Sequence, residues 1–287
     1  MPVISTRGLT HLYSKGTPFE VAAIKDISID IEKGELVGII GHTGSGKSTL
    51  IQHLNGILKP EQGTVLLNGK DIWASKQSIR EARFQVGLCF QYPEYQLFEE
   101  TVYKDIAFGP KNMKLGEDEV DRRVRAAAEY VGLKEELLQK SPFDLSGGEK
   151  RRAAIAGVMA MEPAVLILDE PTAGLDPRGR DKILDLIKNY RDNTGSTVLL
   201  VSHCMEDIAR LASRVLVLEN ASVAMFGSVR EVYSRGSELF GMGLNVPQVT
   251  RIFEGLRDRG LNVSTGIFTV EQGRQELLRF FGKGAKA

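Results

Sequence analysis

The sequence predicts an α/β fold in which short buried strands alternate with helices. Four apolar runs, residues 36–40, 86–90, 165–168 and 197–201, have the length and composition of strands in a parallel sheet. Glycine-rich or polar segments follow these runs, at the position where ligands bind in open α/β sheets. We therefore expect a functional site at the carboxyl edge of the sheet.

The composition is that of a globular protein with one large domain, or one domain and a small appendage. Of the 287 residues, 42% are hydrophobic and 26% are charged. Lysine plus arginine and aspartate plus glutamate are balanced at 37 each, so the net charge gives no argument for binding to nucleic acid. The two cysteines, Cys89 and Cys204, lack the spacing of a metal site and favour a reducing compartment.

We expect neither a signal peptide nor a membrane span. The first residues lack the apolar core of a signal peptide, and no apolar run approaches the roughly 18 residues that a transmembrane helix needs. Docking onto a membrane protein stays compatible with both observations.

The clearest motif is a phosphate-binding loop of the form G-x-x-x-x-G-K-[ST]. It lies between the predicted strand 36–40 and a predicted helix at 48–56, which is the context that the motif requires. Glycines let the backbone wrap around an anion, and the free N–H groups at the helix start point towards it. Lys47 would neutralise the β- and γ-phosphates of a nucleotide, and the Ser48 hydroxyl would bind Mg²⁺. The expected nucleotide-binding residues are Gly41, His42, Thr43, Gly44, Ser45, Gly46, Lys47, Ser48 and the adjoining Thr49.

Two further regions leave alternatives open. Alternating patterns at residues 3–9 and 23–31 predict strands joined by a polar loop from His11 to Glu20. In this loop, Tyr13 is either an exposed turn aromatic or a platform for an adenine ring. Gln91 ends the predicted strand 86–90 and begins a loop that contains Tyr92, Tyr95, Leu97 and Phe98. These large side chains form either a local core or a docking surface.

Polar residues with chemical potential follow two of the buried strands. Asp169 and Glu170 are adjacent carboxylates, which cannot both be buried without partners. Beside the phosphate loop, Asp169 could hold Mg²⁺ through water and Glu170 could polarise an attacking water. His203 follows the strand 197–201 and would contact the γ-phosphate. For the side chains of His11, His42 and His53 we expect no catalytic role, although His42 belongs to the phosphate loop.

The remaining segments predict helices. Residues 101–133 carry helical signals, and Leu145, Ser146, Gly147, Gly148 and Glu149 precede a predicted helix at 150–161. Paired glycines at a helix start form an anion site, whereas the basic residues from Lys150 onwards oppose the helix dipole. Near Gly227 the pattern changes, and amphipathic segments at 246–260 and 270–281 predict a small helical appendage.

These motifs, in this order, resemble the ATPase subunits of ATP-binding cassette transporters, over residues 1 to about 227. The form of the phosphate loop, residues 90–98 and the tail segment 245–249 look like the energy-coupling factor importers of vitamins and metal ions. The resemblance implies a P-loop ATPase core with an antiparallel β subdomain and a helical signature subdomain (1–227). It also implies a helical C-terminal extension (228–287) for dimerisation of the ATPases.

The same resemblance assigns roles to the motif residues. ATP and Mg²⁺ are the implied cofactors, with Ser48, Gln91 and Asp169 at the metal, and Tyr13 is then favoured as the adenine platform. Glu170, His203 and Gln91 are the implied catalytic residues. The signature residues Leu145, Ser146, Gly147, Gly148 and Glu149 would cap the γ-phosphate of a second subunit, and Asp176 would lie in the dimer loop. Many cassettes have glutamine at the position of Glu149, but this difference removes no catalytic group.

The implied partners are a second ATPase, identical or paralogous, and two membrane proteins. A transmembrane coupling protein would dock at Gln91 to Phe98, and a substrate-binding membrane protein would complete the complex at the cytoplasmic face of the membrane. No nucleic acid is expected. One alternative is a chromosome-maintenance or DNA-repair ATPase, but residues 47–146 contain no sustained heptads. The other is a non-catalytic nucleotide sensor, which Glu170 disfavours.

Overall fold

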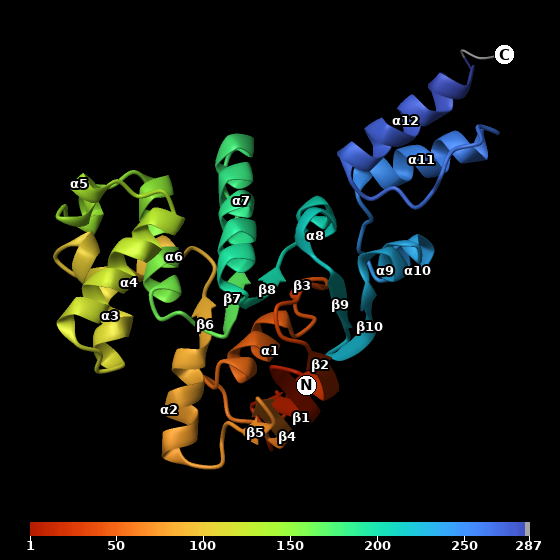
Figure 1. Ribbon diagram of the computed structural model, residues 1–287. Helices are drawn as coiled ribbons and strands as arrows, with labels where there is room; N and C mark the ends of the chain where they lie inside the picture. The colour runs from red at the N-terminus through yellow and green to blue at the C-terminus, as the bar shows by residue number, and fades with distance from the viewer. Residues whose placement is uncertain (285–287) are drawn as a thin grey trace.

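Two β-sheets form the centre of the computed structural model, which describes residues 1–284 (Figure 1). The larger sheet has the strand order β10-β9-β3-β8-β7-β6. Its strands are β3 (Leu36–Ile40), β6 (Val86–Cys89), β7 (Val165–Asp169), β8 (Thr197–Val201), β9 (Arg214–Glu219) and β10 (Ser222–Ser228). All are parallel except β10, which forms a hairpin with β9. The four strands predicted from apolar runs are therefore confirmed, and they are neighbours.

The smaller sheet is antiparallel, with the order β2-β1-β4-β5. It consists of β1 (Ile4–Tyr13), β2 (Val21–Ile31), β4 (Gln62–Leu67) and β5 (Lys70–Asp71). The prediction that a loop begins at His11 is wrong, because β1 continues to Tyr13 and pairs there with Val21. Cross-strand pairing with β2, including bulges, overrides the polar composition of this segment. The turn after β4 consists of Asn68 and Gly69, which both have positive φ.

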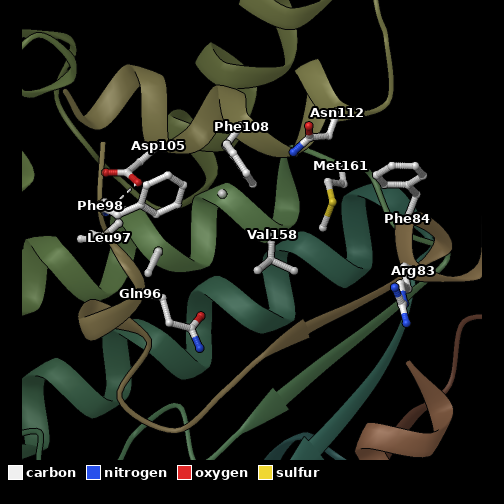
Figure 2. Close-up of a pocket in the computed structure, with 14 residues that line it drawn as sticks. Arg83, Phe84, Gln96, Leu97, Phe98, Asp105, Phe108, Asn112, Val158 and Met161 are labelled. Carbon is white, nitrogen blue, oxygen red and sulfur yellow. Dashed lines mark hydrogen bonds between the residues drawn. The ribbon is translucent and has the colours of Figure 1, made fainter. Parts of the chain in front are cut away.

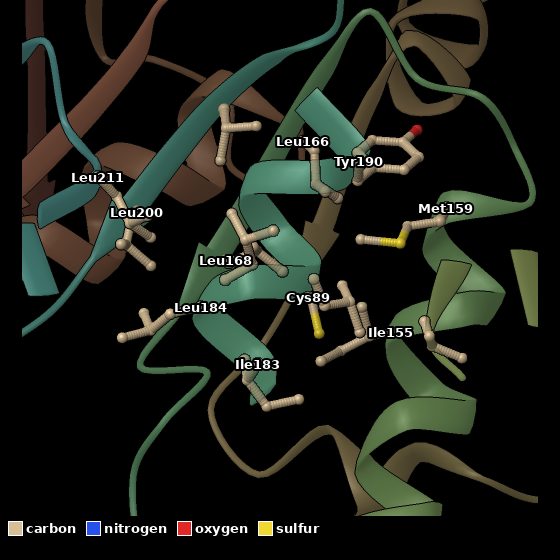
Figure 3. Close-up of a cluster of buried hydrophobic side chains, with 14 of the residues drawn as sticks. Cys89, Ile155, Met159, Leu166, Leu168, Ile183, Leu184, Tyr190, Leu200 and Leu211 are labelled. Atoms are coloured by element: carbon tan, nitrogen blue, oxygen red, sulfur yellow. The ribbon is translucent and has the colours of Figure 1, made fainter. Parts of the chain in front are cut away.

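The alternation of side chains along the parallel strands separates two hydrophobic cores. Leu36 and Ile40 of β3 face one core, whereas Val37 and Ile39 face the other. On the first face lie α6 (Gly147–Met159), α7 (Pro177–Thr194) and α8 (Met205–Leu211). Figure 3 shows their contribution to this core, in which Ile155 and Met159 of α6 and Ile183 and Tyr190 of α7 surround the strands. On the second face, α1 (Lys47–Leu54) and the antiparallel sheet share a core with the strands.

A helical layer lies beside the sheet, next to β6 (Figure 1). It contains α3 (Val102–Asn112), α4 (Glu117–Tyr130), α5 (Glu135–Leu138) and α6, with the short 3₁₀ helices η1 (Pro93–Gln96) and η2 (Pro142–Asp144). The helix α2 (Lys76–Gln85) leads into β6. Helix α6 begins at Gly147, earlier than the predicted residue 150, because Ser146 and Glu149 form a capping pair at its start.

The helices beyond Gly227 form two groups. Val232 of α9 (Val229–Tyr233) and Leu239 of α10 (Gly236–Gly241) belong to the main core. The helices α11 (Gln248–Asp258) and α12 (Val270–Gly284) instead form a small core around Phe253 and lie at the far end of the molecule (Figure 1). The domain boundary at 227/228 stays a prediction. None of the helices in residues 1–284 combines the length and apolarity that a membrane crossing requires.

Candidate functional site

The predicted site residues converge because four neighbouring strands end at the same edge of the sheet. In the order β3, β8, β7 and β6, the strand ends are followed by the phosphate loop, His203, Asp169 with Glu170, and Gln91. Parallel strands present their carboxyl ends on one edge, so residues from four distant segments reach a common place.

The phosphate loop has the backbone that its glycines make possible. Gly46 has φ of 103°, and a Cβ atom there would lie 2.3 Å from the carbonyl oxygen of Ala23. Lys47 follows at the start of α1, and its Nζ donates to the carbonyl oxygens of Gly41 and His42, at 2.6 and 3.0 Å. Burial lowers the pKa of Lys47, and the charges of Glu170 and Asp169 oppose this effect. The ammonium group is thus buried, faces two carboxylates and is ready to meet an anion. Ser48 is exposed.

Tyr13 lies beside the phosphate-loop helix. Its hydroxyl is 3.4 Å from Oγ1 of Thr49, and its ring, 44% exposed, packs edge-on against His11. An adenine platform would have to be a partly exposed aromatic ring next to this helix. The position of Tyr13 therefore supports its interpretation as that platform.

The acidic pair shows two marks of a functional site. Glu170 has φ of 49°, a strained conformation for a non-glycine residue, and its buried Oε1 accepts no hydrogen bond from the described residues. Burial and the adjacent Asp169 raise the pKa of Glu170 to about 7. Burial also raises the pKa of Asp169, with Lys47 opposing, and it lowers the pKa of His203. His203 Nε2 lies 3.5 Å from Glu170 Oε1.

The donor set fits a magnesium ion that completes its shell with phosphate and water. The described residues contain no group of three or more acidic, histidine or cysteine side chains in metal geometry. Mg²⁺ is usually bound through one or two carboxylates together with substrate phosphates and water. The Asp169 carboxylate, together with the Ser48 hydroxyl and the exposed amide of Gln91, would suit such a site.

The signature residues do not join this cluster. Ser146 and Gly147 are exposed at the start of α6, and Gly147 faces open space. The backbone N–H and the hydroxyl of Ser146 both donate to Glu149, and Leu145 is buried beneath them. Figure 1 shows α6 in the helical layer, well apart from α1. Asp176 caps α7 by accepting from the N–H of Gly179, and it is exposed as well. These residues are therefore free to meet another molecule.

Comparison with known proteins decides the family. Residues 24–173 match the ABC transporter family model. The chain is 53% identical, over 98% of both chains, to the energy-coupling factor transporter ATP-binding protein EcfA2 of Clostridium tetani. It is 45% identical to the EcfA2 protein of Listeria innocua, over 98% of this chain and 99% of that protein. This chain belongs to the ABC transporter family.

Solved structures of the family agree with this assignment. The structure of cbiO1 from Clostridium perfringens, described as part of the ABC transporter complex cbiONQ, is 40% identical. It matches 88% of this chain and 99% of its own, with a TM-score of 0.74. The cassette MJ0796, described as a dimer in a post-hydrolysis state with ADP and Pi, is 26% identical over 79% of this chain and 99% of its own, with a TM-score of 0.70. Within the family, the chain is therefore an ATPase of the energy-coupling factor transporters.

The fold also argues against a chromosome-maintenance or DNA-repair ATPase. Such ATPases separate their motifs by a long coiled coil. Between Lys47 and Ser146 of this ABC protein, the longest helix is α4, with 14 residues.

The structure adds functional candidates that the sequence did not single out. Arg151 of α6 is 3% exposed and pairs with Glu94 of η1, whereas Asp105 of α3 accepts from the N–H groups of Phe98 and Glu99. The sequence contains one indication of Arg151. Basic residues at the start of a helix oppose the helix dipole, so their presence at the start of α6 suggested a role other than helix stabilisation.

A groove of about 310 Å³ lies next to this loop, and Figure 2 shows its lining. The lining residues come from α2, η1 and its continuation, α3 and α6; they include Phe84, Gln96, Phe98, Phe108, Val158 and Met161. Tyr95 and Phe98 are 85% and 59% exposed, whereas Leu97 is buried. The loop thus combines one inward anchor with outward aromatics.

Proposed function

We propose that this protein is the ATP-hydrolysing subunit of an energy-coupling factor importer of vitamins or metal ions, at the cytoplasmic face of the membrane. The observation that carries the proposal is the meeting of phosphate loop, Asp169, Glu170, His203 and Gln91 at the ends of four adjacent strands. Full-length similarity to proteins named as transporter ATP-binding subunits supports the same function.

In the proposed mechanism, the phosphate loop and Lys47 bind the triphosphate, and Tyr13 supports the base. Lys47 exchanges its two carbonyl partners for phosphate oxygens, a stronger, charge-assisted contact. Glu170 orients and polarises the attacking water, with His203 beside its carboxylate. When bound, Mg²⁺ would neutralise charge on the phosphates, held by Ser48, Asp169 and Gln91. Its charge would also oppose the raised pKa of Glu170.

The exposed signature supports a composite site formed with a second ATPase. We propose that Ser146, Gly147 and Gly148 cap the γ-phosphate bound by the partner, with Leu145 and Glu149 shaping this helix start and Asp176 lying in the dimer loop. In one chain alone, α6 lies in the helical layer and α1 lies beside the sheet, in separate parts of the fold (Figure 1). ATP would then favour the closed dimer, and hydrolysis would release it.

Docking of the membrane partner is proposed at Gln91 to Phe98. Exposed Phe98 lines an apolar groove, and the exposed Tyr95 belongs to the same loop. Aromatic side chains around a pocket are frequent hot spots of interfaces. Gln91 begins the same loop at the hydrolysis site. A transmembrane coupling protein of the importer is the proposed occupant, with a substrate-binding membrane protein in the same complex.

The C-terminal extension is proposed to contribute to dimerisation. Ile252, Leu278 and Phe281 are exposed on α11 and α12, although these helices have a core of their own. Paired apolar side chains at the surface of a small helical unit suit contact with a like unit. Size-exclusion chromatography of the two ATPases without nucleotide, with Leu278 and Phe281 replaced by serine, is the measurement that tests this role.

The substitution Glu170→Gln tests the proposed chemistry. The amide keeps the shape of the side chain but cannot polarise water, so the hydrolysis rate should fall by roughly 10²–10⁴. ATP binding should persist and trap an ATP-bound dimer, observable by gel filtration with ATP. Glu238→Gln, an exposed carboxyl on α10, is the matched control and should leave turnover unchanged. Near wild-type turnover in Glu170→Gln would move the role to another residue.

A further inference from the structure

One buried arginine touches three of the functional segments at once. The guanidinium of Arg151 donates from Nε and from one Nη to the two carboxylate oxygens of Glu94, at 3.1 and 2.8 Å. Its other Nη donates to the carbonyl oxygens of Pro171 and Ala173. The residue itself belongs to α6, which begins with the signature. Its side chain also approaches the ring of Tyr92, with Cζ 5.9 Å from the centroid.

This arrangement fixes geometry more than it adds stability. A buried ion pair roughly balances its desolvation penalty against its attraction, so it is weak ground for a stability argument. Burial opposes ionisation of Glu94, yet the hydrogen bonds and charge of Arg151 prevail and lower the pKa of this carboxyl. The planar guanidinium meets the carboxylate in a two-pronged contact, which determines orientation as well as distance.

The partners of Arg151 belong to two different functional segments, the proposed docking loop and the segment that follows Glu170. Glu94 sits in η1, one residue before the exposed Tyr95 and three residues after Gln91. Pro171 directly follows the strained Glu170, and Ala173 lies three residues before Asp176. A shift of η1 would therefore be transmitted through Glu94 and Arg151 to the backbone that carries the water-polarising carboxylate.

We propose that Arg151 is a positioning residue that connects the proposed docking loop, residues 91–98, with residues 171–173, which follow Glu170. Contact of the membrane partner with η1 fixes Glu94, which orients Arg151, which in turn sets the carbonyl groups of Pro171 and Ala173. The inference rests on the proposed function for the docking half of the link. A purely structural anchor would hold α6 against the sheet without this transmission.

The experiment compares whole transporter complexes that carry Arg151→Lys or Glu94→Gln. Lysine keeps the charge but loses the fork, and glutamine keeps the shape but loses the charge. Misplacement at a distance from the reacting atoms can lower a rate by up to about 10², so we expect kcat to fall by about 10-fold to 10²-fold. KM for ATP should stay close to wild type. The melting temperature should fall, because the change at one partner of a buried ion pair leaves the other charge poorly compensated, so kcat is compared at a temperature at which every variant is folded. The double variant should be no slower than the slower single variant, because both remove the same link.

Arg123→Met is the matched control. Arg123 is also largely buried in the helical layer, but its partners are Glu119, Glu162 and the carbonyl of Met161. In Arg123→Met the melting temperature should fall, but kcat should stay close to wild type. Parallel losses of kcat and melting temperature in all three variants would reduce Arg151 to a structural anchor, and an unchanged kcat would overturn the link outright.

Hydrogen–deuterium exchange supplies a second readout that bears on transmission directly. In wild type, assembly with the membrane partner should change exchange in residues 171–176, and Arg151→Lys should abolish this change while the complex stays assembled. The same response in both proteins would overturn the proposal. Failure of the wild-type complex to assemble or to hydrolyse ATP would contradict the proposed function instead, so the two failures are distinguishable.

Discussion

Unpartnered buried polar atoms mark the residues of this protein that deviate from ordinary packing. Most buried polar groups in proteins have a hydrogen-bond partner, so exceptions call for an explanation. For Glu170 the explanation is chemical, since its orphaned Oε1 lies in a strained segment beside Lys47 and His203. His53 has no such chemical role. It lies on α1, and its fully buried ring packs against His11.

The buried state of His53 predicts a loss of stability in acid. Burial and the neighbouring His11 lower the pKa of His53 to about 4 in the folded chain. The unfolded chain binds a proton near the ordinary pKa of about 6.5. Stability is therefore complete above about pH 6.5 and falls as the pH is lowered towards 4, by at most about 1.4 kcal/mol per pH unit. In His53→Phe, which cannot titrate, the melting temperature should fall less between pH 7 and pH 5. An equal fall in both proteins would show that other groups control acid unfolding.

At the scale of elements, the sequence predicted what local patterns encode. The apolar runs at β3, β6, β7 and β8 have the length of buried strands, and the motif residues follow them directly, so the strand ends and their chemistry were predictable. The end of β1 was not, because Tyr13 is placed by pairing with Val21 and by the contact with Thr49. The pair of Arg151 with Glu94 was equally hidden, since no pattern links residues 57 positions apart.

For the aromatic loop at residues 92–98, the choice between a local core and a docking surface depended on which side chains face solvent. Leu97 points into the core, as a purely structural loop would require, but Tyr95 and Phe98 do not. Phe98 stacks edge-on with Phe108 at the side of the groove (Figure 2). Helical composition around Pro93 gives no indication of these directions, so the sequence could only state both possibilities.

Removing these two rings should separate docking from folding. In the double variant Tyr95→Ala/Phe98→Ala, little buried surface is lost, so melting temperature and ATP binding should stay nearly unchanged. Interface aromatics can contribute about 2 kcal/mol or more each, so the subunit should no longer co-purify with its membrane partner. Phe19→Ala, an exposed aromatic in the β1–β2 connection, is the control and should retain the partner. A large fall in melting temperature with the complex intact would identify the aromatics as core residues.

At the scale of the whole molecule, the chain holds the phosphate loop and the proposed signature in separate places. The phosphate loop lies on the sheet and the signature lies in the helical layer (Figure 1). Under the proposed function, a single copy would bind ATP at the phosphate loop and offer the signature elsewhere, but would not close one site with both. Two chains that face each other can pair each phosphate loop with the signature of the partner.

This separation predicts different defects for Lys47→Ala and Ser146→Arg. Lys47 is the buried cation of the phosphate loop, so its loss should abolish ATP binding by the isolated subunit. Ser146 is exposed at the start of α6, so Ser146→Arg should leave that binding largely intact and instead block closure by filling the space before Gly147. Nucleotide titration of the monomer and gel filtration with ATP in the Glu170→Gln background measure the two effects separately. If Ser146→Arg blocked binding by the monomer, the signature would act within its own chain, and the composite site would be wrong.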